Sequence, residues 1–173
     1  MAVMDGLGHG PHAAVAAERM AAVVREHRTE PPDRLLMLAH KGLVDTRGVT
    51  ATIAAIDATL HRMTWLGVGN VSGALVRADP DTRPRTHGVF LGRGVLGHQM
   101  PPLHRPEPLR LAKGDCIVFN TDGVHADVTA ATHTHLSVER IAQTILDNGA
   151  LPNDDALVLV ARYYPTDEGA LPR

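Results

Sequence analysis

The order of secondary-structure patterns along the chain predicts an α+β fold. A short apolar strand comes first, two helical patterns follow, several strands occupy the middle, and a helix and a strand come last. Helices and strands that are segregated in this way favour α+β over a doubly wound parallel sheet. The 173 residues, of which 44% are hydrophobic, suffice for one domain with a substantial core.

The first part of the chain is typical of a strand, a glycine-rich turn and two helices. Residues 1–5 form an apolar strand that stops at the Gly6–Gly10 turn. Apolar residues then recur at helical spacing over about 11–28, and a proline suits the first turn of that helix. A second helix is expected over 33–44, with Asp33 as its N-cap.

The rest of the chain is mainly strand. Apolar runs bounded by turn residues predict strands at 50–58, 63–68, 72–77, 89–91, 116–120 and 156–164, and helical spacing predicts a helix over 136–148. Gly69-Asn70 is expected to join two of these strands as a hairpin turn. Residues 92–108 should form a loop. We therefore expect one domain over 1–164 and a frayed tail over 165–173.

Composition and charge exclude several classes of protein. Seventeen basic and 19 acidic residues give a net charge of -2, too balanced for nucleic-acid binding. The single cysteine, Cys116, excludes a disulfide framework and a cysteine-based zinc site, and a reducing cytoplasm is the simplest setting. No apolar run approaches the roughly 20 residues of a membrane span, and the first residues, which lack a basic region and an apolar h-region, lead us to expect no signal peptide.

Three aspartates share one local design. Asp5 and Asp122 each end an apolar strand and are followed by glycine, and Asp154 immediately precedes the last strand. We expect three strands of one sheet to bring these carboxylates together. Their mutual repulsion would be relieved by a hard divalent cation, Mg²⁺ or Mn²⁺, bound through oxygen ligands. Gly6, which has no side chain, could add its backbone carbonyl as a ligand.

Each signal has a simpler interpretation when it is taken alone. An Asp-Gly pair is usually a turn. The Gly6–Gly10 run could cradle a phosphate before a helix, but it matches neither the P-loop nor the complete dinucleotide fingerprint. His133 and His135 would share a metal only on a strand, and we expect a loop there.

Five motifs in order resemble the SpoIIE branch of the PPM protein phosphatases. The motifs are Asp5-Gly-Leu-Gly-His-Gly10, Gly48-Val-Thr-Ala-Thr52, Gly67-Val-Gly-Asn-Val71, Gly114-Asp115 with Thr121-Asp-Gly-Val124, and Asn153-Asp-Asp-Ala156. The resemblance spans residues 1–164. The third motif is most like the RsbX-type stressosome phosphatases.

The resemblance implies an αββα sandwich, in which two antiparallel sheets lie between helix pairs. It also implies two Mn²⁺ or Mg²⁺ ions: Asp5 would bridge them, the Gly6 carbonyl would bind the second, and Asp122 and Asp154 would bind the first. A metal-bound water would hydrolyse phosphoserine or phosphothreonine, with no side chain assigned as catalytic. The implied substrate is a phosphorylated STAS-type regulator of a stress or sigma-factor pathway.

The chain departs from the family pattern in two places. Family members have strands and another acidic residue before the Asp-Gly motif. One expectation is therefore that the fold lacks its N-terminal strands and holds the second metal by fewer ligands, in which case a homodimer could cover the open edge. Leu7 stands where other branches have a histidine, and His9 is not assigned as a general acid. The alternative functions are a partner-binding module without activity and a nucleotide-binding protein that uses Gly6–Gly10.

Overall fold

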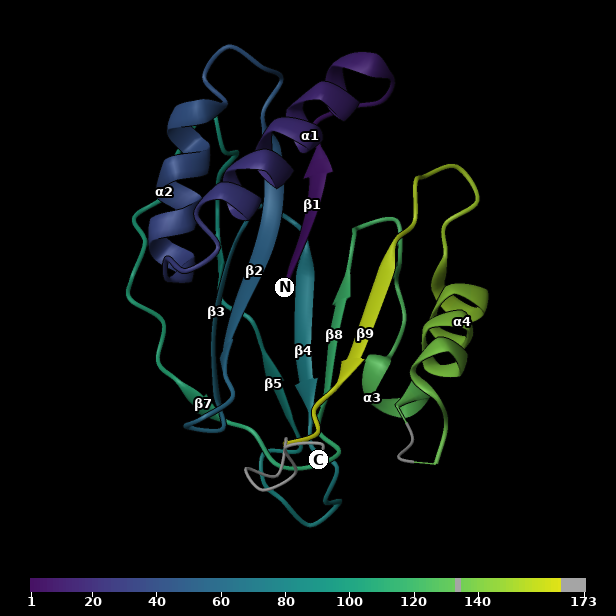
Figure 1. Ribbon diagram of the computed structural model, residues 1–173. Coiled ribbons are helices and arrows are strands. Elements are labelled where there is room, and N and C mark those ends of the chain that lie inside the picture. The colour runs from purple at the N-terminus through teal and green to yellow at the C-terminus, as the bar shows by residue number, and fades with distance from the viewer. Residues whose placement is uncertain (133–134, 166–173) are drawn as a thin grey trace, which may run out of the picture.

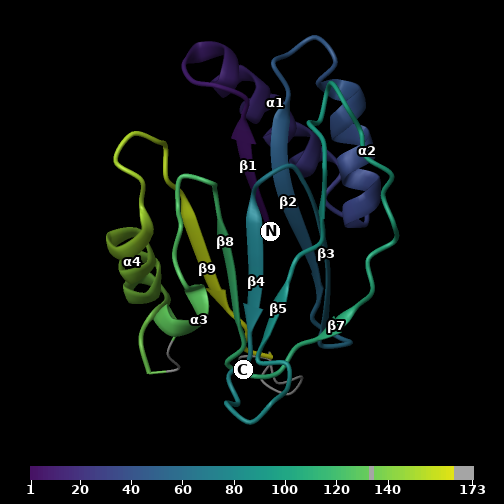
Figure 2. The ribbon, with the colours of Figure 1, turned by 180° about the vertical axis from the view of Figure 1, so that it is seen from behind.

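The computed structural model describes residues 1–132 and 135–165, and four layers make up its fold (Figures 1 and 2). Two sheets lie face to face, with α1 and α2 outside the first and α3 and α4 outside the second. The predicted α+β class and αββα sandwich are confirmed. His133 and residues 166–173 of the predicted tail lie outside the described residues.

Nine strands and four helices are present in the described part of the chain. In chain order they are β1 (Ala2–Gly6), α1 (Pro11–Glu26), α2 (Pro32–Gly42), β2 (Val49–Asp57), β3 (Arg62–Val68), β4 (Ser72–Val76), β5 (Thr86–Gly88), β6 (Leu91–Gly92), β7 (Leu109–Arg110), β8 (Cys116–Asn120), α3 (Val128–Ala131), α4 (Val138–Gly149) and β9 (Val158–Arg162). None of the described helices is long and apolar enough to cross a membrane.

The two sheets have simple strand orders. The first is β1-β2-β3-β6, with β7 also paired to β3, and the second is β5-β4-β8-β9. All pairs are antiparallel except the two-residue pairing of β3 with β6, which is parallel. β1 therefore has one strand neighbour, β2, among the described residues.

Alternating side chains of the sheets fill three hydrophobic layers. Between the sheets, Trp65 of β3 and Phe119 of β8 meet with ring centroids 6.3 Å apart. Outside the first sheet, Met20 and Leu36 of the helices pack on β2 and β3. Outside the second, Ile141 of α4 packs with Val118. Trp65 and Cys116 are both buried in these layers.

The predicted hairpin between 63–68 and 72–77 is wrong. β3 and β4 form as expected, but they belong to different sheets. The Gly69–Val71 segment carries the chain from one sheet to the other, where Thr52 Oγ1 donates to the Val71 carbonyl over 2.5 Å. A glycine-containing turn serves a hairpin and a crossover equally well, so the local sequence could not distinguish them.

The predicted strand at 89–91 is also wrong in its bounds. The structure has β5 before this position and β6 at its end, and Val89 and Phe90 lie between them. The Val89 amide donates to Gly73 of the second sheet, and the Phe90 carbonyl accepts from Gly67 of the first. These two residues thus form a second crossover between the sheets.

Two helix starts differ from expectation. Pro31, in an extended conformation, is the N-cap of α2, and Asp33 lies in the first turn of that helix, where its charge favours the helix dipole. The short helix α3 was not predicted. Its N-cap Asp127 accepts from the Thr129 and Ala130 amides. The predicted helix at 136–148 is α4, and Ser137 is its N-cap.

Phe119 is the largest fully buried side chain and lies between the sheets, whereas Phe90 is 59% exposed. Phe119→Ala should therefore lower the free energy of unfolding by about 3–5 kcal/mol. The matched Phe90→Ala should change it by less than about 0.5 kcal/mol. Urea denaturation measures both, and equal effects would contradict the placement of the core.

Candidate metal centre

The strand ends that carry the predicted aspartates lie at one edge of the sandwich. β1 ends, β8 ends and β9 begins at the upper edge in Figure 1. The expectation that one sheet supplies all three carboxylates is wrong. Asp5 belongs to the first sheet, whereas Asp122 follows β8 and Asp154 precedes β9 in the second. They meet because the two sheets are stacked face to face.

The charges around Asp5 have one sign. Burial raises the pKa of the Asp5 carboxyl, and the negative charges of Asp122, Asp154 and Asp155 raise it further. Within the described ranges, the Lys, Arg and His side chains form ion pairs at other places: Arg19 with Asp45, Arg62 with Asp57 and Arg77 with Asp115. Asp5 therefore lies among three further carboxylates, and none of the four forms an ion pair among the described residues.

The carboxylates interact electrostatically, but their oxygens are not arranged around a common metal position. Among residues 1–132 and 135–165, no three His, Cys, Asp or Glu side chains are arranged to hold a metal ion as they stand. The oxygen-only donors and the uncompensated charge fit a hard divalent cation. The binding of metal by Asp5, Asp122 and Asp154 stays a prediction. Asp155, beside Asp154, adds a charge that the sequence analysis did not assign.

Asn70 joins the two sheets at this edge, a role that its predicted place in a hairpin turn did not indicate. The Thr50 hydroxyl donates to Asn70 Oδ1 over 2.6 Å, and Asn70 Nδ2 donates to Asp122 Oδ2 over 2.5 Å. Thr50 of β2 lies opposite Asp5 of β1 in the strand register. The bridge therefore connects Thr50, the strand partner of Asp5, to the carboxylate of Asp122. Its only sequence signal was its place in a family motif.

Gly69 allows this bridge to form. Its φ is 95°, a conformation that favours glycine, and a Cβ atom there would overlap the Thr50 side chain. The crossover thus passes close to Thr50, which places Asn70 between Thr50 and Asp122.

The loops that carry Asp122 and Asp154 are fastened to each other. The Leu157 amide donates to Thr121 Oγ1 over 3.0 Å, and the Leu151 amide donates to the Gly123 carbonyl over 2.8 Å. A Cβ atom on Gly123 would overlap the Asp155 carbonyl oxygen. The glycine after Asp122 therefore serves loop-to-loop packing.

Gly6 has a packing role as well. It is buried, and a Cβ atom there would overlap the Ala13 carbonyl oxygen of α1. The glycine lets the first turns of α1 lie directly against the end of β1. Coordination by the Gly6 carbonyl stays a prediction.

Gly114-Asp115 lies outside this centre. Asp115 is 1% exposed, accepts from Arg77 Nη1 over 2.8 Å and also accepts from the Ala78 and Ala112 amides. This buried pair fastens the start of β8 to the end of β4. The motif is structural.

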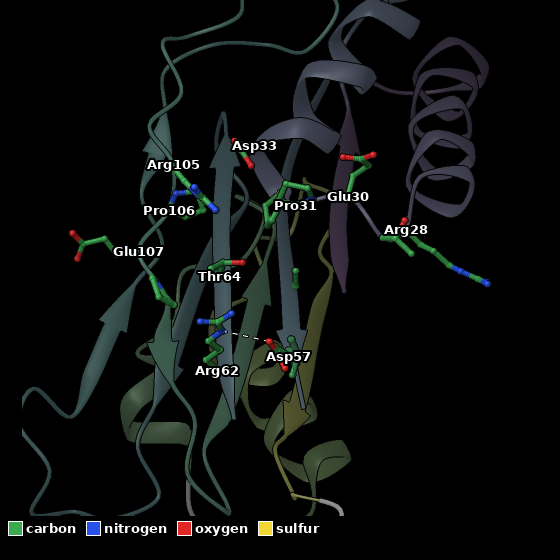
Figure 3. Close-up of a pocket in the computed structure, with 15 residues that line it drawn as sticks. Arg28, Glu30, Pro31, Asp33, Asp57, Arg62, Thr64, Arg105, Pro106 and Glu107 are labelled. Atoms are coloured by element: carbon green, nitrogen blue, oxygen red, sulfur yellow. Dashed lines mark ion pairs between the residues drawn. The ribbon is translucent and has the colours of Figure 1, made fainter. Parts of the chain in front are cut away.

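A cavity of about 820 Å³ lies away from the carboxylates. It is bounded by the α1–α2 loop, the far ends of β2 and β3, and residues 105–108 (Figure 3). The Arg62–Asp57 ion pair crosses its floor, and Arg28 points outward. At about 3.3 Å per strand residue, Asp57 is some 20 Å along β2 from Thr50.

The chain matches the family described as Stage II sporulation protein E (SpoIIE) over residues 1–164. It belongs to the SpoIIE family. It is 24% identical over 147 residues to the phosphoserine phosphatase RsbX of Bacillus subtilis (strain 168), a match that covers 83% of this chain and 70% of RsbX. The predicted SpoIIE-like branch of the PPM phosphatases is thereby confirmed, and the relationship supports protein phosphatase function.

Solved structures agree with this membership of the SpoIIE family. A chain of the structure described as "The bacterial stressosome: a modular system that has been adapted to control secondary messenger signaling" superposes with a TM-score of 0.80 at 26% identity, covering 93% of this chain and 83% of that one. RsbX in complex with magnesium gives a TM-score of 0.79 at 24% identity, covering 92% and 77%. The second comparison shows a shared fold.

Asp5→Asn should stabilise the metal-free protein at pH 7. A carboxyl whose folded pKa is raised above its ordinary 3.8 loses folding stability as the pH rises from that value through the folded pKa, and a neutral amide avoids this loss. The gain in the free energy of unfolding should disappear at acid pH, where Asp5 is protonated. Urea denaturation in EDTA at pH 3 and pH 7 measures it.

The control is Asp147→Asn, an exposed aspartate on α4 that bonds to Gln143. It should show no such gain at pH 7. A destabilised Asp5→Asn protein in EDTA would contradict the repulsion among the carboxylates.

Proposed function

We propose that this chain hydrolyses phosphoserine or phosphothreonine on a regulatory protein with the help of divalent metal ions. The observation that carries the proposal is the group of four carboxylates around Asp5, which has no positive partner among the described residues. A phosphorylated substrate would be repelled from this edge unless cations compensated the charge. Divalent cations that bridge carboxylates and phosphoryl oxygens would satisfy both groups.

Four groups would hold the metal ions. They are the side chains of Asp5, Asp122 and Asp154 and the backbone carbonyl of Gly6. When bound, Mn²⁺ or Mg²⁺ supplies a lowered pKa for an attacking water and neutralises charge on the phosphoryl oxygens. Two ions are proposed, and Asp5 and Gly6 are the protein ligands assigned to the second.

The chain's own residues would orient these ligands. Asn70 holds one oxygen of Asp122 by its hydrogen bond and leaves the other oxygen available. Thr121 and Gly123 hold the Asp122 loop against the loop of Asp154. In the reaction a water oxygen bonds to phosphorus, the bond from phosphorus to the serine or threonine oxygen breaks, and that oxygen takes up a proton. The products are inorganic phosphate and the free hydroxyl.

The proposed substrate is a phosphorylated STAS-type regulator of a stress or sigma-factor pathway. RsbX is named as a phosphoserine phosphatase, and the description of a similar structure names the bacterial stressosome. These relationships support a regulatory phosphoprotein over a metabolite.

A partner-binding module without activity is the second candidate, because the carboxylates do not surround one point as they stand. Nucleotide binding by Gly6–Gly10 is disfavoured, because the neighbouring carboxylates would repel its phosphates and would have no role of their own.

Asp122→Asn should lower the hydrolysis of an aryl phosphate in Mn²⁺ by at least about 100-fold, since loss of a direct ligand should exceed the 10–100-fold typical of outer-shell changes. The wild type should be inactive in EDTA. Release of phosphate measures the rate, and Asp147→Asn is again the control.

A binding measurement separates the candidates. Mn²⁺ should raise the urea midpoint of the wild type and not that of Asp122→Asn. Metal-independent turnover would contradict the mechanism, whereas metal binding with no turnover of any phosphoserine substrate would favour the partner-binding module.

Asn70→Ala should weaken metal affinity or activity by about 10–100-fold, because Asn70 orients a proposed ligand from outside the metal. Titration of activity with Mn²⁺ should show a higher half-saturating concentration. Asn148→Ala, at an exposed position on α4, is the matched control and should behave as the wild type. Equal half-saturating Mn²⁺ concentrations for the two variants would contradict a role for Asn70 in orienting a metal ligand.

A further inference from the structure

A groove of about 790 Å³ begins at the loop that follows Asp5 and Gly6. Its walls are the β1–α1 loop, one face of α1 and the segment between α2 and β2. Leu7 and Val15 contribute apolar surface and are 42% and 46% exposed. His12, Val15 and Arg19 are spaced along α1 so that they share one face. The groove is therefore an open, partly apolar channel beside the proposed metal centre.

The charge of this groove is positive and differs in sign from that of the carboxylates. Arg19 is neutralised by Asp45, with 2.5 Å between Arg19 Nη1 and Asp45 Oδ1. Arg47 is exposed, and its side chain makes no hydrogen bond or ion pair within the described part of the chain. Asp45 is the only acidic residue in the lining, so Arg47 leaves one uncompensated positive charge.

The backbone makes room for Arg47. Gly8 has φ 81°, and Arg47 Nη1 lies 3.1 Å from the place that a Gly8 Cβ atom would occupy. The guanidinium thus lies over the glycine loop. Nearby, α1 begins at Pro11 with no side-chain cap and no acidic residue in its first turn, which adds to the positive potential.

The register of β1 and β2 sets the distance from the proposed reaction centre. Asp5 lies opposite Thr50, Gly6 lies opposite Val49, and the Leu7 amide donates to the Gly48 carbonyl over 3.0 Å. Arg47 is three residues before Thr50, which spans at most about 10 Å, and the bend at Gly48, whose φ is 85°, shortens this distance. An extended peptide covers the same distance in about three residues.

We propose that this groove binds the segment of the phosphoprotein that flanks the phosphorylated residue, and that Arg47 pairs with an acidic side chain two or three positions away. The inference rests on the proposed function and specifies its substrate class: a phosphoserine or phosphothreonine in an acidic sequence. Arg47 is a specificity-determining residue. The apolar surface of Leu7 and Val15 contacts the peptide between the two anchors.

The test compares two phosphoserine peptides that differ only at the second and third positions on each side, which are glutamate in one and glutamine in the other. The wild type should favour the glutamate peptide in kcat/KM by about three- to tenfold at low salt, and less at high salt. Arg47→Ala should remove this preference and leave aryl phosphate hydrolysis unchanged. Arg47→Glu should favour a lysine-flanked peptide instead.

Arg28→Ala is the matched control. Arg28 is exposed and borders the distant cavity, so its loss removes the same charge without touching the groove (Figure 3). An unchanged glutamate preference in Arg47→Ala would overturn the proposal. So would an equal loss of aryl phosphate hydrolysis, because Arg47 would then act on the phosphoryl group itself.

A peptide-binding measurement tests the groove separately from the proposed phosphatase activity. Fluorescence anisotropy of the two labelled peptides with Asp122→Asn measures the glutamate preference without turnover. If the glutamate preference in binding depends on Arg47, the proposed groove is supported even when the wild type hydrolyses neither peptide. A lack of hydrolysis by the wild type would refute only the phosphatase activity. Equal binding of both peptides would refute the groove.

Discussion

The repulsion among Asp5, Asp122, Asp154 and Asp155 is the constraint on which the functional edge of this protein depends. Four carboxylates that have no ion-pair partner among the described residues oppose close approach of the two sheets at this end. The sheets stay together because the apolar layer between them, with Trp65 and Phe119 in contact, stabilises the sandwich. Stability is thus supplied by the core, and the edge is left with charge that a cation can neutralise.

The Thr50–Asn70–Asp122 bridge shows how the fold controls this edge. A single amide side chain accepts a hydrogen bond from the first sheet and donates one to the second. It can do so because the chain crosses between the sheets at Gly69, whose backbone conformation and contact with Thr50 both require glycine. The same crossover that creates the two-sheet architecture therefore supplies the group that orients a proposed ligand.

Opposite charges lie side by side at this edge of the sandwich. The carboxylates of the two sheets gather near the strand ends, and Arg47 lies over the neighbouring glycine loop. A cation site next to an anion-binding groove suits a substrate that has a phosphoryl group and a flanking acidic sequence. The two regions share the β1–α1 loop, so the short Asp5–Gly10 segment contributes to both.

The sequence by itself determined the α+β class, most of the strands and the three aspartates at strand ends. These features depend on local periodicity and on Asp-Gly junctions, which neighbouring residues encode. The resemblance of five ordered motifs added the αββα arrangement and the family. Local signals could not decide which sheet each strand joins, because a glycine turn serves a hairpin and a crossover alike.

Only the tertiary structure decided that Asp5 lies near Asp122 and Asp154 from a different sheet, that Asn70 bridges Thr50 and Asp122, and that Asp115 belongs to a buried ion pair. It also revealed that Gly6 and Gly123 serve close packing against Ala13 and Asp155. Most of these contacts join groups far apart in the sequence. Their contacts are fixed by burial of the apolar layer between the sheets, a property of the whole chain that no local window contains.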